Sequence, residues 1–147
     1  MSVIAVNKRA RFDYDILEKF EAGLVLRGFE VKSVKTGHIS LKGSFVTVKG
    51  EELFLTNANI PLYKHAGAIA NYDPTRPRKL LMHRREIAHL IGKSRAEGLT
   101  LVPIRVYTRR SLLKLEFGVG KGRKKHDKRE VIKKRESKRK IERALKR

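Results

Sequence analysis

The last 27 residues of the chain, 121–147, constrain its fold most, because they cannot contribute to a hydrophobic core. They contain 15 lysines and arginines but only four acidic residues and few apolar side chains. So little apolar surface cannot offset the conformational entropy that ordering would cost. We therefore expect a folded body, residues 1–120, and a basic C-terminal tail, residues 121–147, that is disordered when free. Three glycines in the stretch Gly118-Val119-Gly120-Lys121-Gly122 predict a hinge between them.

The body mainly has the sequence pattern of β-strands. In residues 14–26 the even positions are apolar except for Glu18, whereas the odd positions include charged residues and glycine. This period of two predicts a strand with one apolar face. Because Glu18 interrupts that face, a helix over residues 15–20 stays open as an alternative.

Two pairs of apolar runs predict β-hairpins. Residues 44–49 and 53–56 flank a turn that contains Gly50, and residues 99–108 and 112–117 flank a short polar connection. In the last run Leu113, Leu115 and Phe117 point to one side, and the charged residues between them point to the other. This alternation predicts a strand with one buried face.

Helical patterns are fewer. Residues 84–97 place Ile87, Leu90 and Ile91 on one face, and Gly98 follows where a C-terminal cap belongs. Residues 27–36, ended by Gly37, predict a second helix. Several short strands in meander order with covering helices indicate a mainly β fold, a small closed or nearly closed antiparallel barrel.

Charge narrows the choice of partner. The 147 residues include 36 lysines and arginines against 15 acidic residues, a formal net charge of +21. Such an excess favours a polyanion, either nucleic acid or an anionic membrane. No apolar run approaches the roughly 18 residues of a membrane-spanning helix, and the N-terminus is too short for a secretory signal. Because the tail also has too little apolar surface for stable insertion, we expect a cytoplasmic nucleic-acid-binding protein without a membrane partner.

The sequence gives little indication of a cofactor site or a catalytic site. The chain lacks cysteine, which excludes disulfides and thiolate metal sites, and no two of its five histidines have the spacing of metal ligands. His83 and Glu86 lie three residues apart at a predicted helix start, where acid–base work on RNA is chemically feasible. An acidic residue there is far more often a partner of the helix dipole. We therefore expect no cofactor, no metal and no enzyme activity, with a ribonuclease as a minor alternative.

Two basic segments are candidate nucleic-acid contacts. Pro74 and Pro77 keep residues 71–79 extended, and cations are dense from residue 76 to residue 85. We interpret this segment as a ridge that contacts phosphates, because the planar guanidinium grips phosphate at two points; a solvated basic loop is the alternative. Residues 7–11 alternate cations with other residues and predict a flexible basic arm, with a solubilising chain end as the alternative.

The motifs of the chain, taken in order, resemble one family. They are Asn7-Lys8-Arg9-Ala10-Arg11, Phe20-Glu21-Ala22-Gly23-Leu24, Gly28-Phe29-Glu30-Val31-Lys32-Ser33, the run 73–86, and Lys124-Lys125-His126-Asp127-Lys128-Arg129. Across almost the whole chain they are similar to the SsrA-binding protein family, also called small protein B. The resemblance implies a bacterial protein with an OB-fold-like barrel of six antiparallel strands and about three flanking helices.

The resemblance also implies a function. Members of this family bind the tRNA-like domain of transfer-messenger RNA and deliver it to stalled ribosomes for trans-translation, so that incomplete peptides are tagged for degradation. We expect a monomer whose ribosomal partners are the small-subunit rRNA, the decoding centre and the vacant messenger channel, where the tail becomes helical. A structural ribosomal or rRNA-binding protein with a basic extension is the alternative that composition does not separate from this one.

The predicted site residues form two sets. The RNA-binding set combines the basic segments with positions carried over from the resemblance: Asn7, Lys8, Arg9, Arg11, Glu21, Lys35, Arg76, Arg78, Lys79, Leu81, His83, Arg84 and Arg85. The set for the ribosome and the tail comprises Phe12, Gly122, Lys124, Lys125, Asp127, Lys128 and Arg129. Glu21 enters only through the resemblance, and its carboxylate is expected to accept base amino groups or to orient a neighbouring arginine.

Two positions depart from the family pattern. Phe12 stands where many members have histidine, so stacking on a ribosomal base is retained while the hydrogen bond of an imidazole is lost. Lys35 replaces the usual arginine and keeps the charge without the two-point grip on phosphate. The resemblance therefore carries over stacking and charge at these positions, and not the hydrogen bonds.

Overall fold

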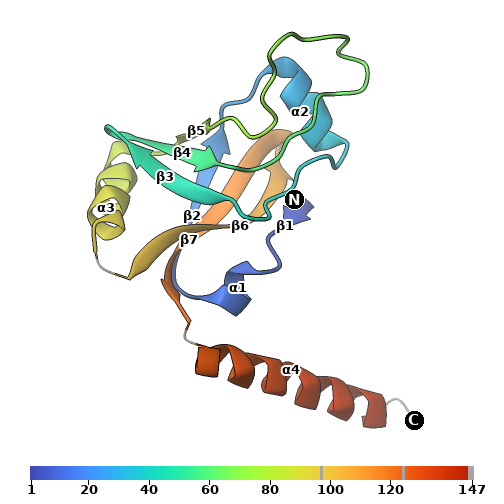
Figure 1. Ribbon diagram of the computed structural model, residues 1–147, viewed down its shortest axis with the longest axis vertical. Coiled ribbons are helices and arrows are strands. Elements are labelled where there is room, and N and C mark those ends of the chain that lie inside the picture. The colour runs from blue at the N-terminus through green and yellow to red at the C-terminus, as the bar shows by residue number, and fades with distance from the viewer. Residues whose placement is uncertain (97, 124, 146–147) are drawn as a thin grey trace.

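The computed structural model describes residues 1–96, 98–123 and 125–145, and it leaves out the side chains of residues 125–128, 130, 131, 142, 144 and 145. Its elements are β1 (Ser2–Val6), α1 (Ala10–Asp13), β2 (Tyr14–Leu24), α2 (Gly28–Lys35), β3 (Phe45–Lys49), β4 (Glu52–Thr56), β5 (Arg78–Leu81), α3 (Arg84–Ser94), β6 (Leu99–Arg109), β7 (Leu112–Gly122) and α4 (Lys125–Leu145) (Figure 1). The fold is mainly β, as predicted. Its described residues form seven strands and four helices, where six strands and about three helices are expected from the resemblance.

All seven strands belong to one antiparallel sheet with the order β1-β6-β7-β2-β5-β4-β3. The part formed by β3, β4 and β5 folds over the long strands β6 and β7, and β3 also contacts β6 (Figure 1). β1, a strand that the sequence patterns do not predict, occupies the free edge of β6. Within the described residues β1 and β3 remain separate edges. The sheet is therefore curved but not closed, so of the two expected forms, closed or nearly closed, the closed barrel is wrong.

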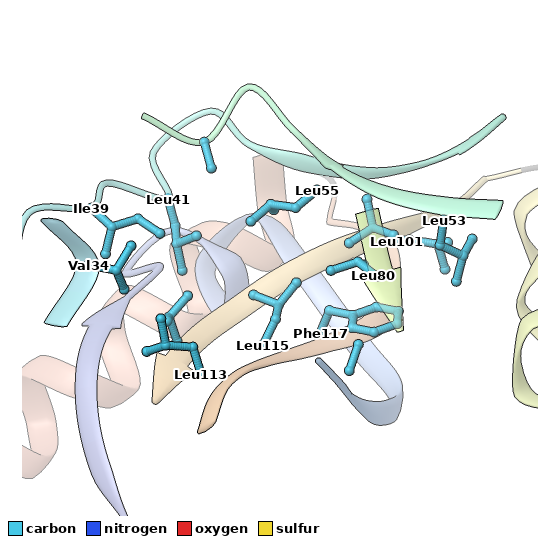
Figure 2. Packing of buried hydrophobic residues seen from close by; sticks show 14 of the residues in the cluster. Val34, Ile39, Leu41, Leu53, Leu55, Leu80, Leu101, Leu113, Leu115 and Phe117 are labelled. Atoms are coloured by element: carbon cyan, nitrogen blue, oxygen red, sulfur yellow. The ribbon is translucent and has the colours of Figure 1, made fainter. Parts of the chain in front are cut away.

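The hydrophobic core lies between the two parts of the curved sheet. Strand β4 contributes Leu53 and Leu55, and β7 contributes Leu113, Leu115 and Phe117 from the opposite side (Figure 2). Removing a side chain of this size from water contributes about 2 kcal/mol. The burial of alternate residues in β7 confirms the alternation predicted for residues 112–117.

Strand β2 confirms the period-two prediction and excludes a helix over residues 15–20. Its register against β7 shifts between Ile16 and Glu18, which leaves Leu17 as an extra residue that is 54% exposed. Glu18, the exception in the apolar pattern, lies at the edge of the core and bonds to α3. Its carboxylate is 2.9 Å from His89 Nε2 and 3.8 Å from Lys93 Nζ. Glu18 therefore ties β2 to a covering helix.

The predicted hinge at residues 118–122 is wrong, because these residues are the last part of β7. A Cβ atom added at Gly118 would lie 2.6 Å from the backbone oxygen of Glu18, and one at Gly120 would lie 3.0 Å from Tyr14 Cβ. Gly118 and Gly120 therefore serve close packing against β2 instead of freedom of rotation. Sequence alone does not separate these two uses of glycine.

Both predicted helices are present. The segment 27–36 forms α2, with Arg27 as its N-cap and Thr36 as its C-cap. The segment 84–97 forms α3, which ends three residues earlier, at Ser94, and packs Leu90 into the core. Glu97, the predicted last residue, lies outside the described residues. Gly98 has a φ of +77°, a conformation that glycine adopts without strain.

The tail contains one long helix, α4, which projects from the lower end of the body (Figure 1). Its described apolar side chains Ile132 and Ile141 are 41% and 61% exposed. Burial therefore contributes little to holding this helix, and disorder of the free tail stays a prediction.

A buried ion cluster joins α2 to β5. Glu30 and Arg78 are both fully buried, and Arg78 donates to Glu30 Oε2 from Nε at 3.0 Å and from Nη2 at 2.6 Å. Arg76 donates to both oxygens of the same carboxylate. The Tyr72 hydroxyl oxygen lies 2.7 Å from the Ile60 carbonyl oxygen and 3.1 Å from Glu30 Oε2, so its single proton is shared between these two acceptors. One carboxylate thus bonds to two guanidinium groups and fixes the loop that precedes β5.

The cluster predicts an acid-sensitive fold. Burial by itself raises the pKa of Glu30, but hydrogen bonds from Arg76, the Arg27 backbone N–H and Arg78 outweigh it and lower that pKa from 4.5 to about 2. Because the folded-state pKa is depressed, this stabilisation is present above about pH 4.5 and is lost as the pH falls towards 2. Glu30→Gln should cost about 3–5 kcal/mol at neutral pH and flatten the stability curve between pH 2 and 5.

Urea unfolding at several pH values measures both effects. Glu52→Gln is the matched control, because its partner Lys79 is half-exposed and such pairs contribute little. An unchanged pH dependence in the Glu30 variant would contradict the role assigned to the cluster.

The packing of β7 predicts that Gly118→Ala lowers the free energy of unfolding by about 1–3 kcal/mol, because backbone atoms must move to accept the methyl group. Gly122→Ala is the control within the same strand, since an added Cβ there meets nothing within 4 Å. Thermal and urea unfolding of the two variants give the comparison. A flexible hinge would tolerate both substitutions equally well.

Candidate nucleic-acid interface

The N-terminal basic run is not a flexible arm. Asn7 is fixed to β6, where its backbone N–H donates to the Ile104 oxygen at 2.7 Å and its Nδ2 donates to the Pro103 oxygen at 2.9 Å. Ala10 is buried at the start of α1. The sequence does not reveal this attachment, because both partners lie almost 100 residues away in β6.

The cations of this run are exposed on that fixed base. Lys8, Arg9 and Arg11 all have exposed side chains. Arg9 donates to Asp13 at 3.2 Å, and its guanidinium lies 4.6 Å from the centroid of the Phe12 ring. The run therefore presents cations and one aromatic ring from a short helix that is bonded to the sheet.

The start of the tail lies beside this helix. Gly122 pairs with Tyr14, the Arg123 backbone N–H donates to the Asp13 oxygen at 2.8 Å, and α1 contacts α4. Phe12 and Gly122, both predicted to act on the ribosome, are thus brought to one end of the body. Arg129 of α4 is exposed. Lys124 and the side chains of Lys125, Asp127 and Lys128 lie outside the described residues.

The predicted basic ridge is only partly a surface. β5 alternates, so that Arg78 and Leu80 point into the core while Lys79 and Leu81 point outwards. Arg78 is fully buried on Glu30, and the side chain of Arg76 is 24% exposed and bonded to the same carboxylate. The predicted phosphate contact of Arg78 is therefore wrong in this structure, because no part of it reaches the surface.

The outward residues and the start of α3 make up the exposed remainder of this ridge. Lys79 pairs with Glu52 at 3.2 Å, and Leu81 is 55% exposed. His83 is the N-cap of α3 without a side-chain cap bond, and Arg84 and Arg85 are exposed in its first turn. The first N–H groups of the helix and these cations favour an anion at this point. An open groove of about 750 Å³ runs beside them, with an apolar wall that includes Met82, Ile87 and Ile91.

Glu21 lies on the face of the sheet that points away from the core. Its Oε2 accepts from Arg109 Nη1 at 3.1 Å. Burial, together with a hydrogen bond to Glu21, raises the pKa of Tyr107 above its ordinary value. Glu116, directly opposite Glu21 in the register, bonds to Arg105 at 3.0 Å. Two roles were expected for Glu21, accepting base amino groups or orienting a neighbouring arginine. The structure places an arginine within hydrogen-bond distance of Glu21, as the second role requires.

Further residues on the same face surround Glu21. Leu81 pairs with Gly23, and Gly23 pairs with Lys114. Because glycine has no side chain, the sheet surface is shallow between the outward side chains of Leu81 and Lys114. Arg109 pairs with Leu112, which is 61% exposed. We call Glu21, Leu81, Arg109, Leu112 and Lys114 the sheet-face patch. Sequence reasoning missed its last three members, although the alternation in residues 112–117 indicates the outward direction of Lys114.

The predicted sites are not all in one place. Lys35 is exposed in the last turn of α2, and α2 lies at the opposite end of the body from α1 and α4 (Figure 1). Among the described residues there is no group of three His, Cys, Asp or Glu that is able to hold a metal ion. No helix in the described ranges is long and apolar enough to cross a membrane.

Known proteins match this chain over most of its length. A model of the family described as SmpB protein matches residues 4–147. The SsrA-binding protein of Acaryochloris marina is 53% identical over 145 residues, which cover 99% of this chain and 94% of that protein. The SsrA-binding protein of Thermosipho africanus is 53% identical over 148 residues, which cover 100% of this chain and 99% of that protein.

A solved structure agrees with these relatives. It is described as "tmRNA-SmpB: a journey to the center of the bacterial ribosome" and has a TM-score of 0.69 and 42% sequence identity. The match covers 89% of this chain and 95% of the other. The family resemblance predicted from the motifs is thereby confirmed. Because the family model and the relatives both extend over almost the whole chain, this protein belongs to the SmpB family of SsrA-binding proteins.

Proposed function

We propose that this protein binds the tRNA-like domain of transfer-messenger RNA and delivers it to stalled ribosomes for trans-translation. The observation that carries the proposal is the match over nearly the full chain to proteins named SsrA-binding protein. The similar solved chain is described together with tmRNA, SmpB and the bacterial ribosome. The net charge of +21 agrees with an RNA partner. In this proposal the protein is a cytoplasmic, monomeric RNA-binding protein without enzyme activity, and its curved sheet acts in the manner of an OB-fold.

Three exposed parts of the body supply the RNA contacts in this proposal. They are the α1 region with Lys8, Arg9 and Arg11, the segment of Lys79, Leu81, His83, Arg84 and Arg85, and the outward face of the sheet around Glu21. Asn7, Arg76 and Arg78 act indirectly, since their bonds fix the α1 region and the loop before β5. Lys35 extends the cationic surface at the far end of α2.

The tail has a separate task in this proposal. The body, residues 1–120, holds the RNA, and residues 121–147 act on the ribosome, where they occupy the vacant messenger channel. Phe12, Gly122 and Arg129 belong to this set together with Lys124, Lys125, Asp127 and Lys128. The bonds of Arg123 to Asp13 and Tyr14 support the grouping, because they hold the start of the tail beside α1.

Copurification tests the proposal most simply. The RNA that accompanies the affinity-tagged protein from its own cells should be transfer-messenger RNA, enriched over bulk tRNA at physiological salt. A structural ribosomal protein would instead remain with salt-washed subunits in stoichiometric amount. Recovery of rRNA and tRNA in proportion to their abundance would refute the proposal.

The exposed arginines at the start of α3 predict a change in salt dependence. Arg85→Ala should weaken binding to transfer-messenger RNA and reduce the slope of log K against log salt by about 1, as expected for one lost phosphate contact. Titrations at salt concentrations between roughly 50 and 300 mM, where the screening of exposed charges changes strongly, measure both the affinity and the slope. Lys49→Ala removes an exposed cation from β3 and serves as the control. Equal slopes for the two variants would remove α3 from the interface.

The division of tasks predicts a split effect in the tail. Replacing Asp127, Lys128 and Arg129 by alanine should leave the affinity for isolated transfer-messenger RNA within about twofold and abolish peptide tagging on stalled ribosomes. Filter binding and a reconstituted tagging reaction measure the two properties. Equal losses in both would show that the tail is only an electrostatic arm for RNA.

A further inference from the structure

We propose that the tip of the β6–β7 hairpin, residues 109–112, is a further RNA contact. In this proposal Glu21 positions Arg109 and does not touch the RNA itself. The inference rests on the proposed RNA-binding function and names residues of the same site. It has two independent grounds, the ion pair of Glu21 and the backbone conformation of the turn.

The ion pair leaves the arginine available and the carboxylate occupied. The side chain of Arg109 is 58% exposed, and that of Glu21 is 32% exposed. Arg109 uses Nη1 for Glu21, and among the described residues no other acceptor takes its remaining donors. A guanidinium carries five N–H donors, so most of them stay free for a phosphate. The carboxylate therefore fixes the direction of a cation whose outer side is open.

Glu21 is poorly suited to meet RNA directly. Its carboxylate already accepts from Arg109, and Tyr107 donates to it from a buried position. Glu116 lies directly opposite on β7 and adds a second carboxylate. Two adjacent carboxylates repel phosphate unless cations cover them, and Arg109 and Arg105 are those cations. A positioning role explains how an acidic residue belongs to a surface that binds a polyanion.

The turn itself is strained in a way that points to function. Arg110 has a φ of 51° and Ser111 a φ of 66°, both in the left-handed region. Two-residue hairpin turns of this kind favour Asn-Gly, because other side chains are strained there. Both residues are exposed, so no packing requires them. Strain kept at an exposed turn is typical of functional positions.

The tip also continues the surface that the resemblance identifies. Leu112 is 61% exposed and Leu81 is 55% exposed on the same face, with Gly23 and Lys114 between them in the register. Exposed apolar side chains next to arginines suit an unpaired nucleotide, whose base packs on the leucine while its phosphate meets the guanidinium. The hairpin tip thus extends the sheet-face patch towards Arg110.

A double-mutant cycle tests the positioning role. The dissociation constant of full-length protein for transfer-messenger RNA is measured for Glu21→Gln, Arg109→Ala and the double variant. We expect a roughly tenfold loss for each and no further loss in the double variant, because both remove the same contact. Arg109→Ala and Glu21→Gln should each also reduce the salt slope by about 1, because each loses the same phosphate contact. Additive losses would show that Glu21 contacts RNA by itself and would overturn the role.

The turn provides a second test that unfolding cannot mimic. Replacing Arg110 and Ser111 by Asn and Gly should raise the melting temperature, because it relieves strain, and should weaken RNA binding several-fold. Lys49→Ala in β3 controls for the loss of one exposed charge. Unchanged affinity of the Asn-Gly variant would remove the tip from the interface. If the parent protein itself shows no preference for transfer-messenger RNA, the proposed function fails. The affinity of the same variants for the RNA that does copurify then tests whether the hairpin tip contacts RNA.

Discussion

The bonds of Glu30 to Arg76 and Arg78 are the interaction on which the rest of the structure depends. β5 has only four residues, yet it is the strand that joins β2 to β4 and so connects the two parts of the sheet. Each of its two pairings comprises two residue pairs. Two hydrogen bonds from Arg78 to one oxygen of Glu30 secure this short strand from the inside, while Arg76 and Tyr72 secure the loop before it. Without the carboxylate, two cations would share a dry site.

This arrangement divides the positive charge of the chain into two kinds. Arg76 and Arg78 are bonded to Glu30 within the body and hold the fold. The exposed cations of α1, the start of α3 and the hairpin tip remain for a polyanion, and each is attached to rigid structure. Rigid attachment matters because a preorganised cation loses less entropy on binding than one on a flexible arm. The tail adds most of the remaining charge, and its start contacts both α1 and β2.

Local periodicity predicted the elements well, and partners distant in sequence account for what it missed. The alternation around Phe117 and the helical face around Leu90 identify β7 and α3 because each pattern reports on burial by the same core. Arg78 was expected at the surface, since its carboxylate partner lies 48 residues earlier and nothing local announces it. The glycines of β7 show the same limit, because their close neighbours are in β2. For the site, motif resemblance selected Glu21 and Leu81, whereas only the sheet register brings Arg109 and Leu112 beside them.

The central claim is that the body holds the RNA while the tail stays free of it until the ribosome is reached. Hydroxyl-radical footprinting of side chains in the full chain, with and without transfer-messenger RNA, tests this claim most directly. Leu81, Leu112, Ile132 and Ile141 are all exposed in the structure and report on the body and the tail in one sample. We expect the RNA to protect Leu81 and Leu112 and to leave Ile132 and Ile141 as reactive as before. Protection of the two isoleucines with no change at the two leucines would contradict it.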